Sequence, residues 1–533
     1  MTISADSSPS AGSSLNAARR ARELAAARDE VVDVLVVGLG ATGAGVALDA
    51  ASRGLSVVAI DAHDLAFGTS RWSSKLIHGG LRYLASGQID VAHESAVERG
   101  ALMAHTAPHL VRALPFVLPL TPMVSRSQAA VARAGLQAGD LLRLAARTSR
   151  RTLPGPRRLS TVETLRLAPA LNPHGLRGGL LSWDGQLADD ARLVTALART
   201  AAAHGAKILT RCRALTLTGD GAQVCDELTR RTFGIRARSV VNAAGVWAGG
   251  LVDGVRLRPS RGTHLVVRAE SLRGLTAGMH IPVPGASNQF ILVIPQGDGR
   301  VYIGLTDEPA DGPIPDVPTP TEAEIGFLLD TLDSALDVSV RRDEVIGSFA
   351  GLRPLLDDHP PTNGRPLLND RHGGTADISR RHAVLTSPDG VVTIVGGKLT
   401  TYRRMAQDAV DAVLAAKPGI DAGPSRTARL PLVGAAPPGE LAALDAPRRL
   451  VQRYGMEAPL LAAPARDDAT LLEPVIPGLP VLNAELAWAV RHEGALDASD
   501  LLDRRTRIGL VPADREAALP VAESFVTAPA GVG

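Results

Sequence analysis

The sequence predicts an α/β fold with more than one domain, and three observations support this. The chain has 533 residues, more than one simple core normally holds. Near its start, an apolar and β-branched run at 31–37 precedes a glycine-rich segment and a helical pattern. Far downstream, a strand pattern at 391–395 again leads into two glycines and a helical pattern. Strands that alternate with helices in this way are typical of parallel sheets.

The first glycine-rich segment, residues 38–43, has the spacing of a dinucleotide-binding turn. Gly38 permits the tight turn, Gly40 lets the backbone approach a pyrophosphate, and Gly43 lets the helix pack closely on the strand. The helix N-terminus would present unpaired N–H groups to the phosphates. A second strand pattern ends at Asp61, where a carboxylate can accept hydrogen bonds from ribose hydroxyls. These elements together predict a dinucleotide site rather than a purely structural turn.

Two further segments favour FAD over NAD as the dinucleotide. The strand pattern at 239–242 ends in small residues, including Ala244 and Gly245, which would let the backbone lie against a nucleotide. In the downstream segment, Gly396 and Gly397 would direct a second helix N-terminus toward the cofactor. Such a helix stabilises negative charge on a reduced flavin. An unrelated tight turn is the alternative interpretation of this segment.

Composition argues against several classes of protein. The net charge of +2 gives no global field for nucleic acid, and 3% aromatic residues provide few stacking platforms for single strands. The two cysteines, Cys212 and Cys225, form no CxxC pair, so we expect no disulfide framework and no metal site. No apolar run reaches the roughly 18 residues of a membrane span. We expect residues 1–30 to be a flexible tail leading into a short helix rather than a signal peptide.

Sequence blocks in the rest of the chain resemble one known family. The blocks are SSKLIHGGLRYL at 73–84, DDARL at 189–193, RGTH at 261–264, GLTD at 304–307, GLRPL at 351–355 and GGKLTTYR at 396–403. Together with a C-terminal stretch, they follow one another in family order. The sequence therefore resembles the FAD-dependent, aerobic-type glycerol-3-phosphate dehydrogenases.

This resemblance implies a fold and an activity. The fold would combine a Rossmann-like FAD-binding domain, a mixed-sheet substrate domain of the glycine or D-amino-acid oxidase type, and a C-terminal helical cap. The reaction would oxidise sn-glycerol 3-phosphate to dihydroxyacetone phosphate, with hydride transfer from C2 to flavin N5. Electrons would pass to a quinone or, in some members, to oxygen. Two alternatives stay open: a flavin oxidase of an amine or amino acid, and a flavoprotein without turnover.

The recurring cofactor-binding segments, and a break at residues 424–425 with an Ala/Pro-rich stretch at 434–447, divide the chain into parts. We expect one unit of FAD-binding and substrate-binding domains over residues 31–425, followed by a C-terminal helical domain over residues 426–533. Within the first unit, the FAD-binding elements would lie at about 31–85, 180–250 and 345–415, and strands between them would cover the substrate. Oligomeric state is not readable from the residues, and a homodimer is one option.

A phosphorylated substrate needs fixed cations, because a phosphomonoester carries about two negative charges. By resemblance, Arg353 and Lys398 bind the phosphate, and Arg82, Tyr83 and Arg380 contact the rest of the substrate. Arg353 also lies in an apolar stretch, where an unpaired guanidinium is costly, so its partner would be an internal acid or a ligand. Solvated or structural roles are the alternatives for all of these side chains.

Alcohol oxidation also needs a base for the hydroxyl proton. The candidate is His264, which would sit where a sheet edge meets the flavin, and a structural histidine is the alternative. Arg353 is the second residue assigned to catalysis. The other cofactor positions belong to the glycine turns, to a hydroxyl-rich loop and to its neighbours. They are Ala41, Thr42, Thr69, Ser70, Ser73, Ser74, His78, Gly79, Lys398, Leu399 and Thr400. Arg71 and Trp72 depart from the family, which often has small residues there.

Residues 126–151 carry six arginines, one acid and interleaved leucines. A basic amphipathic helix of this kind would bind an anionic membrane surface, where a quinone is reached. The alternative is a solvated cationic face over the protein's own core, and two glycines weaken the helix. The location that follows is the cytoplasm, with peripheral binding to the inner face of the cell membrane.

Overall fold

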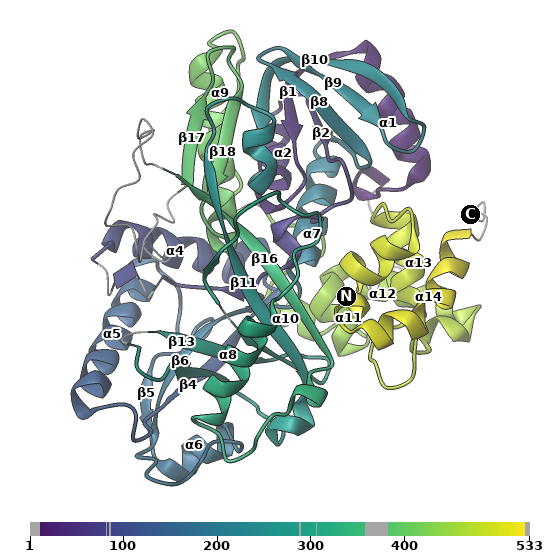
Figure 1. Ribbon diagram of the computed structural model, residues 1–533. Helices are drawn as coiled ribbons and strands as arrows, with labels where there is room; N and C mark the ends of the chain where they lie inside the picture. The colour runs from purple at the N-terminus through teal and green to yellow at the C-terminus, as the bar shows by residue number, and fades with distance from the viewer. Residues whose placement is uncertain are drawn as a thin grey trace.

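The computed structural model describes residues 11–80, 83–84, 87–286, 289–304, 306–357 and 382–527. These residues form a part built on a parallel sheet, a part built on a mixed sheet, and a group of C-terminal helices (Figure 1). The predicted fold class is therefore confirmed.

The first sheet contains the glycine turns. Its central strands are parallel, in the order β18-β10-β1-β2-β7, and an antiparallel β17 and a β8–β9 hairpin extend it. The strands are β1 (Val31–Val37), β2 (Val57–Ile60), β7 (Lys207–Leu209), β8 (Cys212–Thr218), β9 (Gly221–Asp226), β10 (Arg231–Asn242), β17 (His382–Thr386) and β18 (Val392–Gly396). Because β1 is central and buried on both faces, the turn that follows it lies at the carboxyl edge of the sheet.

Helices cover both faces of this sheet. On one face lie α2 (Ala41–Ser52), α7 (Asp190–Ala203) and α9 (Tyr402–Ala416), and α1 (Ala17–Asp29) packs on the other. Small residues bring α2 and α9 together, since a Cβ on Gly45 would lie 3.0 Å from the Tyr402 ring. The short helix expected after the N-terminal tail is α1. It belongs to the packed core, so residues 17–29 are not part of the flexible tail that was predicted for 1–30.

The second sheet has ten strands, with a long path in the order β15-β11-β14-β13-β12-β4-β6-β3. It is mixed, because β12 pairs in parallel with β4 while the other pairs are antiparallel. β16 pairs with β11, and β5 pairs with β6. The strands are β3 (Leu76–Ile77), β4 (Val111–Pro119), β5 (Arg157–Leu159), β6 (Gly179–Leu187), β11 (Leu257–Arg268), β12 (Gly278–Pro282), β13 (Phe290–Pro295), β14 (Arg300–Gly304), β15 (Glu308–Pro309) and β16 (Gly347–Leu356).

The mixed sheet takes strands from segments that were predicted to belong to the FAD-binding part. Strands β3, β6 and β16 fall inside the segments predicted to bind FAD, yet they pair within the mixed sheet. The chain therefore passes between the two sheets more often than the motifs indicate. Strand pairing over long sequence separations decides sheet membership, and local patterns do not record it.

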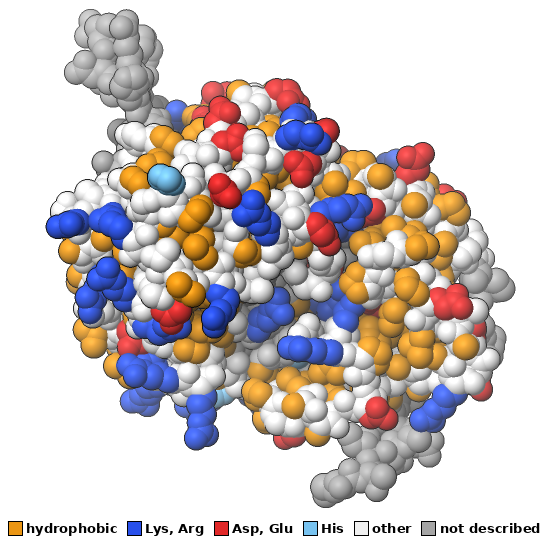
Figure 2. All heavy atoms as spheres, turned by 90° about the horizontal axis from the view of Figure 1, so that it is seen from below, with side chains coloured by type: hydrophobic (Ala, Val, Ile, Leu, Met, Phe, Trp, Pro, Cys, Tyr) orange, Lys and Arg blue, Asp and Glu red, His pale blue; other side chains and the backbone are white. Residues whose placement is uncertain are grey.

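Helices of the described residues that accompany the mixed sheet are α4 (Ile89–Ala101), α5 (Arg126–Ala145), α6 (Thr161–Leu167) and α8 (Glu322–Asp333). The apolar side of α8 packs on β11, β12 and β14. The basic segment forms α5, whose N-terminus is closed by a capping box between Ser125 and Gln128. Basic side chains gather along the left of the face in Figure 2, the side on which α5 lies in Figure 1.

The C-terminal part contains α10 (Pro438–Ala442), α11 (Arg448–Tyr454), α12 (Ala458–Ala462), α13 (Asn483–His492) and α14 (Pro512–Thr527). Buried ion pairs join it to the first sheet. Asp64, which follows β2, accepts hydrogen bonds from Arg504 at 2.6 Å and from Arg505 at 2.7 and 2.9 Å. All three side chains are buried, so separation of the two parts would leave uncompensated charges.

Candidate functional site

A cavity of about 2450 Å³ collects most of the predicted site residues. Ligand pockets usually hold about 300–1,000 Å³, so this one has room for a cofactor and a substrate together. Predicted residues that line it are Gly38, Gly40, Ala41, Thr42, Asp61, Thr69, Ser70, Ser73, Ser74, His78, Tyr83, Ala244, Gly245, His264, Arg353, Gly396, Gly397, Lys398, Leu399 and Thr400. Gly43 and Gly79 are not in the lining but directly follow lining residues in the sequence. Arg82 and Arg380 lie outside the described residues.

The first glycine turn requires each of its glycines for a different steric reason. Gly38 has φ +102°, and a Cβ there would lie 2.6 Å from the Ala243 carbonyl oxygen. On Gly40 a Cβ would lie 2.9 Å from Ser70 Oγ, and on Gly43 only 1.8 Å from the Gly38 carbonyl oxygen. The turn is therefore too tight for side chains, and the N-terminus of α2 opens into the cavity.

Asp61 lies at the carboxyl end of β2, beside this turn. Its carboxylate accepts hydrogen bonds from the backbone N–H of Leu39 at 2.7 Å and of His63 at 2.8 Å. Burial raises the pKa of Asp61 to about 6, although both backbone bonds act in the opposite direction. The side chain thus fixes the backbone of the turn as well as lining the cavity.

The hydroxyl-rich loop after Gly68 is tied to three other elements. Ser70 Oγ accepts a hydrogen bond from the Ala41 N–H at 2.8 Å, at the start of α2. Ser73 Oγ donates to Asp190 Oδ2 at 2.8 Å, and the buried Lys75 Nζ donates to the same oxygen at 2.9 Å. Thr69 in turn donates to a backbone carbonyl of β16 at 2.6 Å. These bonds hold the loop in one position along the cavity.

The second glycine turn adopts the left-handed backbone that its residues allow. Gly396 and Gly397 have φ +77° and +70°. A Cβ on Gly397 would lie 2.4 Å from the Met405 sulfur. The residues that follow form a short helix, Leu399–Thr401, that continues into α9, and Thr400 Oγ1 accepts the His78 N–H at 3.1 Å. This turn and the first one therefore face the same cavity, as predicted.

His78 is positioned by a carboxylate that sequence reasoning did not identify. Its Nδ1 lies 3.0 Å from Asp184 Oδ2, on β6. Arg99 donates to the other oxygen of Asp184 at 2.7 Å, and the Gly79 N–H does so at 3.2 Å. Burial raises the pKa of Asp184, but Arg99 and His78 outweigh it and lower the pKa to about 2. The carboxylate is therefore ionised and orients the imidazole.

Arg353, on β16, has an internal acid partner. Its Nη1 donates to Ser260 Oγ and to Asp307 Oδ1, both at 3.0 Å, and its Nη2 donates to the Thr306 carbonyl oxygen at 2.9 Å. The side chain is 21% exposed and borders the cavity. The sequence left two kinds of partner open for Arg353, an internal acid and a ligand, and the structure shows the acid, Asp307. A ligand as a second partner stays a prediction.

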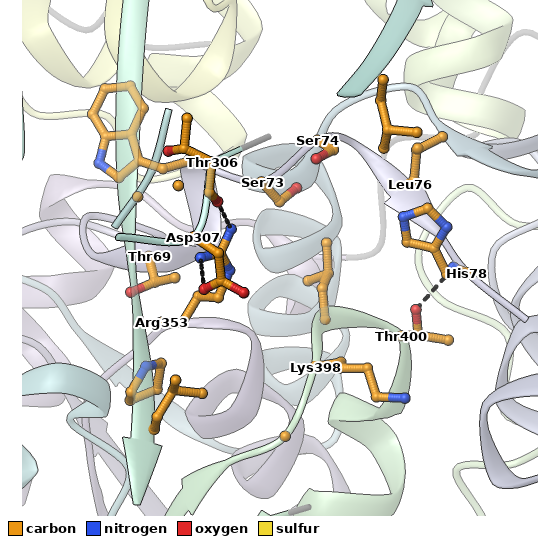
Figure 3. Close-up of a pocket in the computed structure, with 18 of the residues that line it drawn as sticks. Thr69, Ser73, Ser74, Leu76, His78, Thr306, Asp307, Arg353, Lys398 and Thr400 are labelled. Carbon is orange, nitrogen blue, oxygen red and sulfur yellow. Dashed lines mark hydrogen bonds and ion pairs between the residues drawn. The ribbon is translucent and has the colours of Figure 1, made fainter. Parts of the chain in front are cut away.

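Lys398 approaches the cavity from the second glycine turn. Its Nζ donates to Ser95 Oγ at 2.7 Å and lies 3.8 Å from the centre of the Tyr83 ring. Figure 3 shows Arg353 with Thr306 and Asp307 on one side of the view, and Lys398 and His78 on the other. The side chains of Arg353 and Lys398, which come from separate elements, thus both border the cavity.

His264 lies in the interior of the mixed sheet, so its expected place at a sheet edge is wrong. It pairs with Gly304 of β14 on one side and with Phe349 of β16 on the other. Its Nε2 lies 2.8 Å from Ser74 Oγ, and its ring stacks on Phe349 at 4.7 Å. Burial, followed by the charges of Lys75 and Arg353, holds the pKa of His264 well below its usual value. The imidazole is therefore neutral at neutral pH.

Comparison with known proteins decides the family. Residues 33–403 match the model of the DAO family, FAD dependent oxidoreductases, and residues 425–528 match the C-terminal domain of alpha-glycerophosphate oxidase. The chain is 53% identical to glycerol-3-phosphate dehydrogenase 1 of Mycobacterium tuberculosis, over 96% of this chain and 98% of that protein. The chain belongs to the FAD-dependent glycerol-3-phosphate dehydrogenase family.

Solved structures agree with this membership. A glycerol-3-phosphate dehydrogenase from Bacillus halodurans, complexed with FAD, matches with a TM-score of 0.72 and 28% identity, covering 96% of this chain and 95% of that one. L-alpha-glycerophosphate oxidase from Mycoplasma pneumoniae, with FAD bound, matches with a TM-score of 0.54 and 18% identity. That match covers 76% of this chain and 99% of the oxidase, and it shows the fold alone.

The residues of this family member fit FAD. At Gly38 and Gly40 any side chain would meet the backbone or Ser70, and the start of α2 is left open for a pyrophosphate. Asp61 lies at the end of β2 beside the turn, and the second turn at Gly396 lines the same cavity. The cavity thus brings together the elements that the sequence predicted for a dinucleotide site.

Sequence reasoning missed the supporting residues of the site in this family member. Asp307 and Ser260 hold Arg353, Asp184 holds His78, and the Trp247 ring lies 2.8 Å from where a Cβ on Gly68 would be. Asp307 lies in one of the family blocks and could have been proposed from it. Asp184 has no local signal, because its partner is 106 residues away.

Proposed function

We propose that this chain oxidises sn-glycerol 3-phosphate to dihydroxyacetone phosphate and passes the electrons to a quinone. One observation carries the proposal: Arg353 and Lys398 border the same cavity as both glycine turns. Two fixed cations suit a phosphomonoester, whereas a carboxylate substrate would need only one. The printed name of the 53% identical relative supports the same substrate.

Substrate binding would rest on groups that are already oriented. Hydrogen bonds to Ser260, Asp307 and the Thr306 carbonyl hold the Arg353 guanidinium, so little rotamer entropy is lost when it binds a phosphate. Lys398, in the segment after β18, would add a second positive charge to the same cavity. The Tyr83 ring under Lys398 would then lie along the carbon chain of the substrate.

In this proposal, His264 removes the proton from the substrate hydroxyl. His264 lines the cavity and its imidazole is unprotonated at working pH, as a base must be before it accepts a proton. Ser74 orients the imidazole through its hydrogen bond to Nε2, and Phe349 holds the ring plane. Bound FAD supplies the hydride acceptor for C2. His78, fixed by Asp184, is assigned to the flavin-binding wall of the cavity.

Helix α5 supports the quinone part of the proposal. Val131, Leu141 and Leu144 on this helix are exposed. Arginines of the same segment flank them, which is the composition of a helix that lies on an anionic lipid surface. Val131 also lines the large cavity, so α5 borders its mouth. Quinone in a membrane would reach the site along this helix.

Membrane binding would be peripheral in this scheme. Within the described ranges, no helix combines the length and the apolar character that a membrane crossing needs. We propose binding to the inner face of the cell membrane from the cytoplasm. The test is flotation with vesicles containing anionic phospholipid at low salt. Variant L141E/L144E should stay with the soluble fraction while the wild type floats, and a wild type that never floats would refute this part.

Steady-state turnover tests the substrate and the acceptor together. The expected result is reduction of a soluble quinone analogue with glycerol 3-phosphate and formation of dihydroxyacetone phosphate in equal amount. Deuterium at C2 should slow single-turnover flavin reduction if C2 is the hydride donor. Stoichiometric peroxide with oxygen would assign the acceptor to oxygen instead. Turnover of amino acids with no response to glycerol 3-phosphate would replace the proposed substrate.

A further inference from the structure

A second cavity, of about 670 Å³, lies between the first sheet and the C-terminal part. It borders the loop after β2, the β8–β9 hairpin and the segment before α14. His63, Phe67, Trp72 and Arg213 line both cavities, but none of the glycines of the two turns lines this one. Its volume lies in the range that small-molecule sites usually occupy.

The lining of this second cavity is rich in arginine. Among the described residues, seven arginines and three acids line it. The lining alone is therefore strongly cationic, without the carboxylates of residues outside the lining. The arginines are Arg71, Arg211, Arg213, Arg230, Arg504, Arg507 and Arg515, and the acids are Glu227, Asp497 and Asp503.

Among the described residues, five of these arginines have carboxylate oxygens within 3.0 Å, and Arg507 has one at 3.9 Å. The ion pairs are Arg211 with Asp497 and Asp500, Arg213 and Arg230 with Glu227, Arg504 with Asp64 and Asp500, and Arg515 with Asp503. Arg71 and Arg507 differ from them. Among the described residues, no carboxylate oxygen lies within hydrogen-bond distance of either guanidinium.

Arg71 is the more unusual of the two. It is only 2% exposed, and its guanidinium lies 4.7 Å from the Phe67 ring centre and 4.4 Å from that of Trp72. Within the described part of the chain, its Nε is buried without a hydrogen-bond partner. Burial, and then repulsion from Arg504 and Arg507, lower the pKa of Arg71 to about 9. A buried cation in this setting is costly unless an anion joins it.

Arg507 binds the same loop from the C-terminal side. Its Nη2 donates to the Arg71 carbonyl oxygen at 2.5 Å and its Nη1 to the Asp503 carbonyl oxygen at 2.7 Å. Its Nε lies 3.9 Å from the nearest carboxylate oxygen, of Asp189. Two arginines from different parts of the chain therefore border one cavity, and among the described residues neither has a carboxylate oxygen at hydrogen-bond distance.

We propose that this second cavity binds a phosphate-bearing anion with two or more negative charges, held by Arg71 and Arg507. A guanidinium matches phosphate oxygens with two parallel N–H donors, and two guanidiniums with no carboxylate at hydrogen-bond distance among the described residues favour a ligand with at least two negative charges. Phe67 and Trp72 would pack beside the ligand as they now pack beside Arg71. The site is separate from the substrate position, because Arg353 and Lys398 line only the first cavity.

The test is calorimetric titration of the FAD-loaded protein with inorganic pyrophosphate at constant ionic strength. The wild type should bind one pyrophosphate per chain, and Arg71→Met should bind at least about tenfold more weakly, the effect of losing a charge-assisted contact. Arg341→Met, which removes an exposed arginine outside the lining, should leave binding unchanged. Absent binding by the wild type, or equal binding by R71M, would overturn the proposal. Release of flavin during the titration would also overturn it, because the anion would then occupy the first cavity.

Unfolding measurements separate a ligand site from a purely structural arginine. Without anion, R71M should be at least as stable as the wild type, because the substitution removes an unneutralised buried charge. Pyrophosphate should then raise the Tm of the wild type and not that of R71M. Loss of stability in R71M with no anion-dependent Tm shift in the wild type would mean that Arg71 serves packing alone. Arg71→Lys, which keeps the charge, is the second variant if R71M does not fold.

The source of the phosphate groups is distinguished by two further titrations. Tighter binding of ATP than of pyrophosphate would identify a nucleotide as the ligand class. Equal binding of the two would identify the phosphate groups alone as the recognised feature. Binding of inorganic phosphate as tight as that of pyrophosphate would restrict the site to a single phosphate.

Discussion

Replacement of Arg353 by methionine tests the substrate-binding part of the proposal most sharply. With the described residues the guanidinium makes three hydrogen bonds, to Ser260, Asp307 and the Thr306 carbonyl. One charge-assisted hydrogen bond to a phosphate contributes about 1.5–3 kcal/mol. Its loss therefore predicts a fall in kcat/KM for glycerol 3-phosphate of about 10- to 150-fold.

The Arg353→Met substitution should lower the free energy of unfolding by less than it raises the activation free energy for turnover. Arg353 and Asp307 are each 21% exposed, and partly solvated pairs contribute about 1 kcal/mol or less. The double variant R353M/D307N keeps the charge balance and should show the same kinetic loss as R353M. Its visible flavin spectrum should be that of the wild type, because neither residue holds the glycine turns.

Arg261→Met is the matched control. Arg261 lies on β11, is 22% exposed and pairs with Glu324 at 2.9 Å, but it does not line the cavity. Its replacement should leave kcat/KM within about twofold of the wild type. An equal loss in R261M and R353M, or an unchanged kcat/KM in R353M/D307N, would refute a phosphate contact at Arg353.

Three more predictions concern the cofactor turn, pH and the C-terminal part. Gly43→Ala should give protein without bound FAD by absorbance, since its Cβ would lie 1.8 Å from the Gly38 carbonyl oxygen; normal flavin content would show that the turn adapts. Burial lowers the pKa of His109 to about 3, so the unfolded state binds its proton first as pH falls below about 6.5. Stability should then drop by about 2 kcal/mol between pH 7 and 5 from this group, and urea unfolding of His109→Gln should show a correspondingly flatter pH profile; an identical profile would contradict this. Asp64→Asn should cost about 3–5 kcal/mol in unfolding free energy, because buried Arg504 and Arg505 lose their shared carboxylate, and a loss under 1 kcal/mol would refute that role.

Local spacing was enough to predict the cofactor turns. The glycine roles at Gly38 and Gly43 depend on neighbours within a few residues or on the adjacent strand, so the sequence contains them directly. The position of Asp61 follows from the end of β2 for the same reason. The fold class was predictable too, because alternation of strands and helices is a local pattern repeated along the chain.

Contacts between distant segments were not predictable in this way. His264 was expected at a sheet edge, but β14 and β16 pair on either side of its strand. The residues next to His264 in the sequence do not indicate either pairing. The partner of Arg353, Asp307, is 46 residues away. Arg71 was visible only as a departure from the family pattern. Its burial beside the C-terminal arginines emerges once Arg507, 436 residues downstream, is placed in contact with it.

Anaerobic photometry of the purified flavoprotein tests the central claim most directly. Addition of glycerol 3-phosphate should bleach the visible absorbance of the oxidised flavin, and a soluble quinone should restore it. Glycerol, which lacks the phosphate that Arg353 and Lys398 are proposed to bind, should bleach it far more slowly at the same concentration. A flavin that stays oxidised with glycerol 3-phosphate, or that is bleached equally fast by glycerol, would contradict the account.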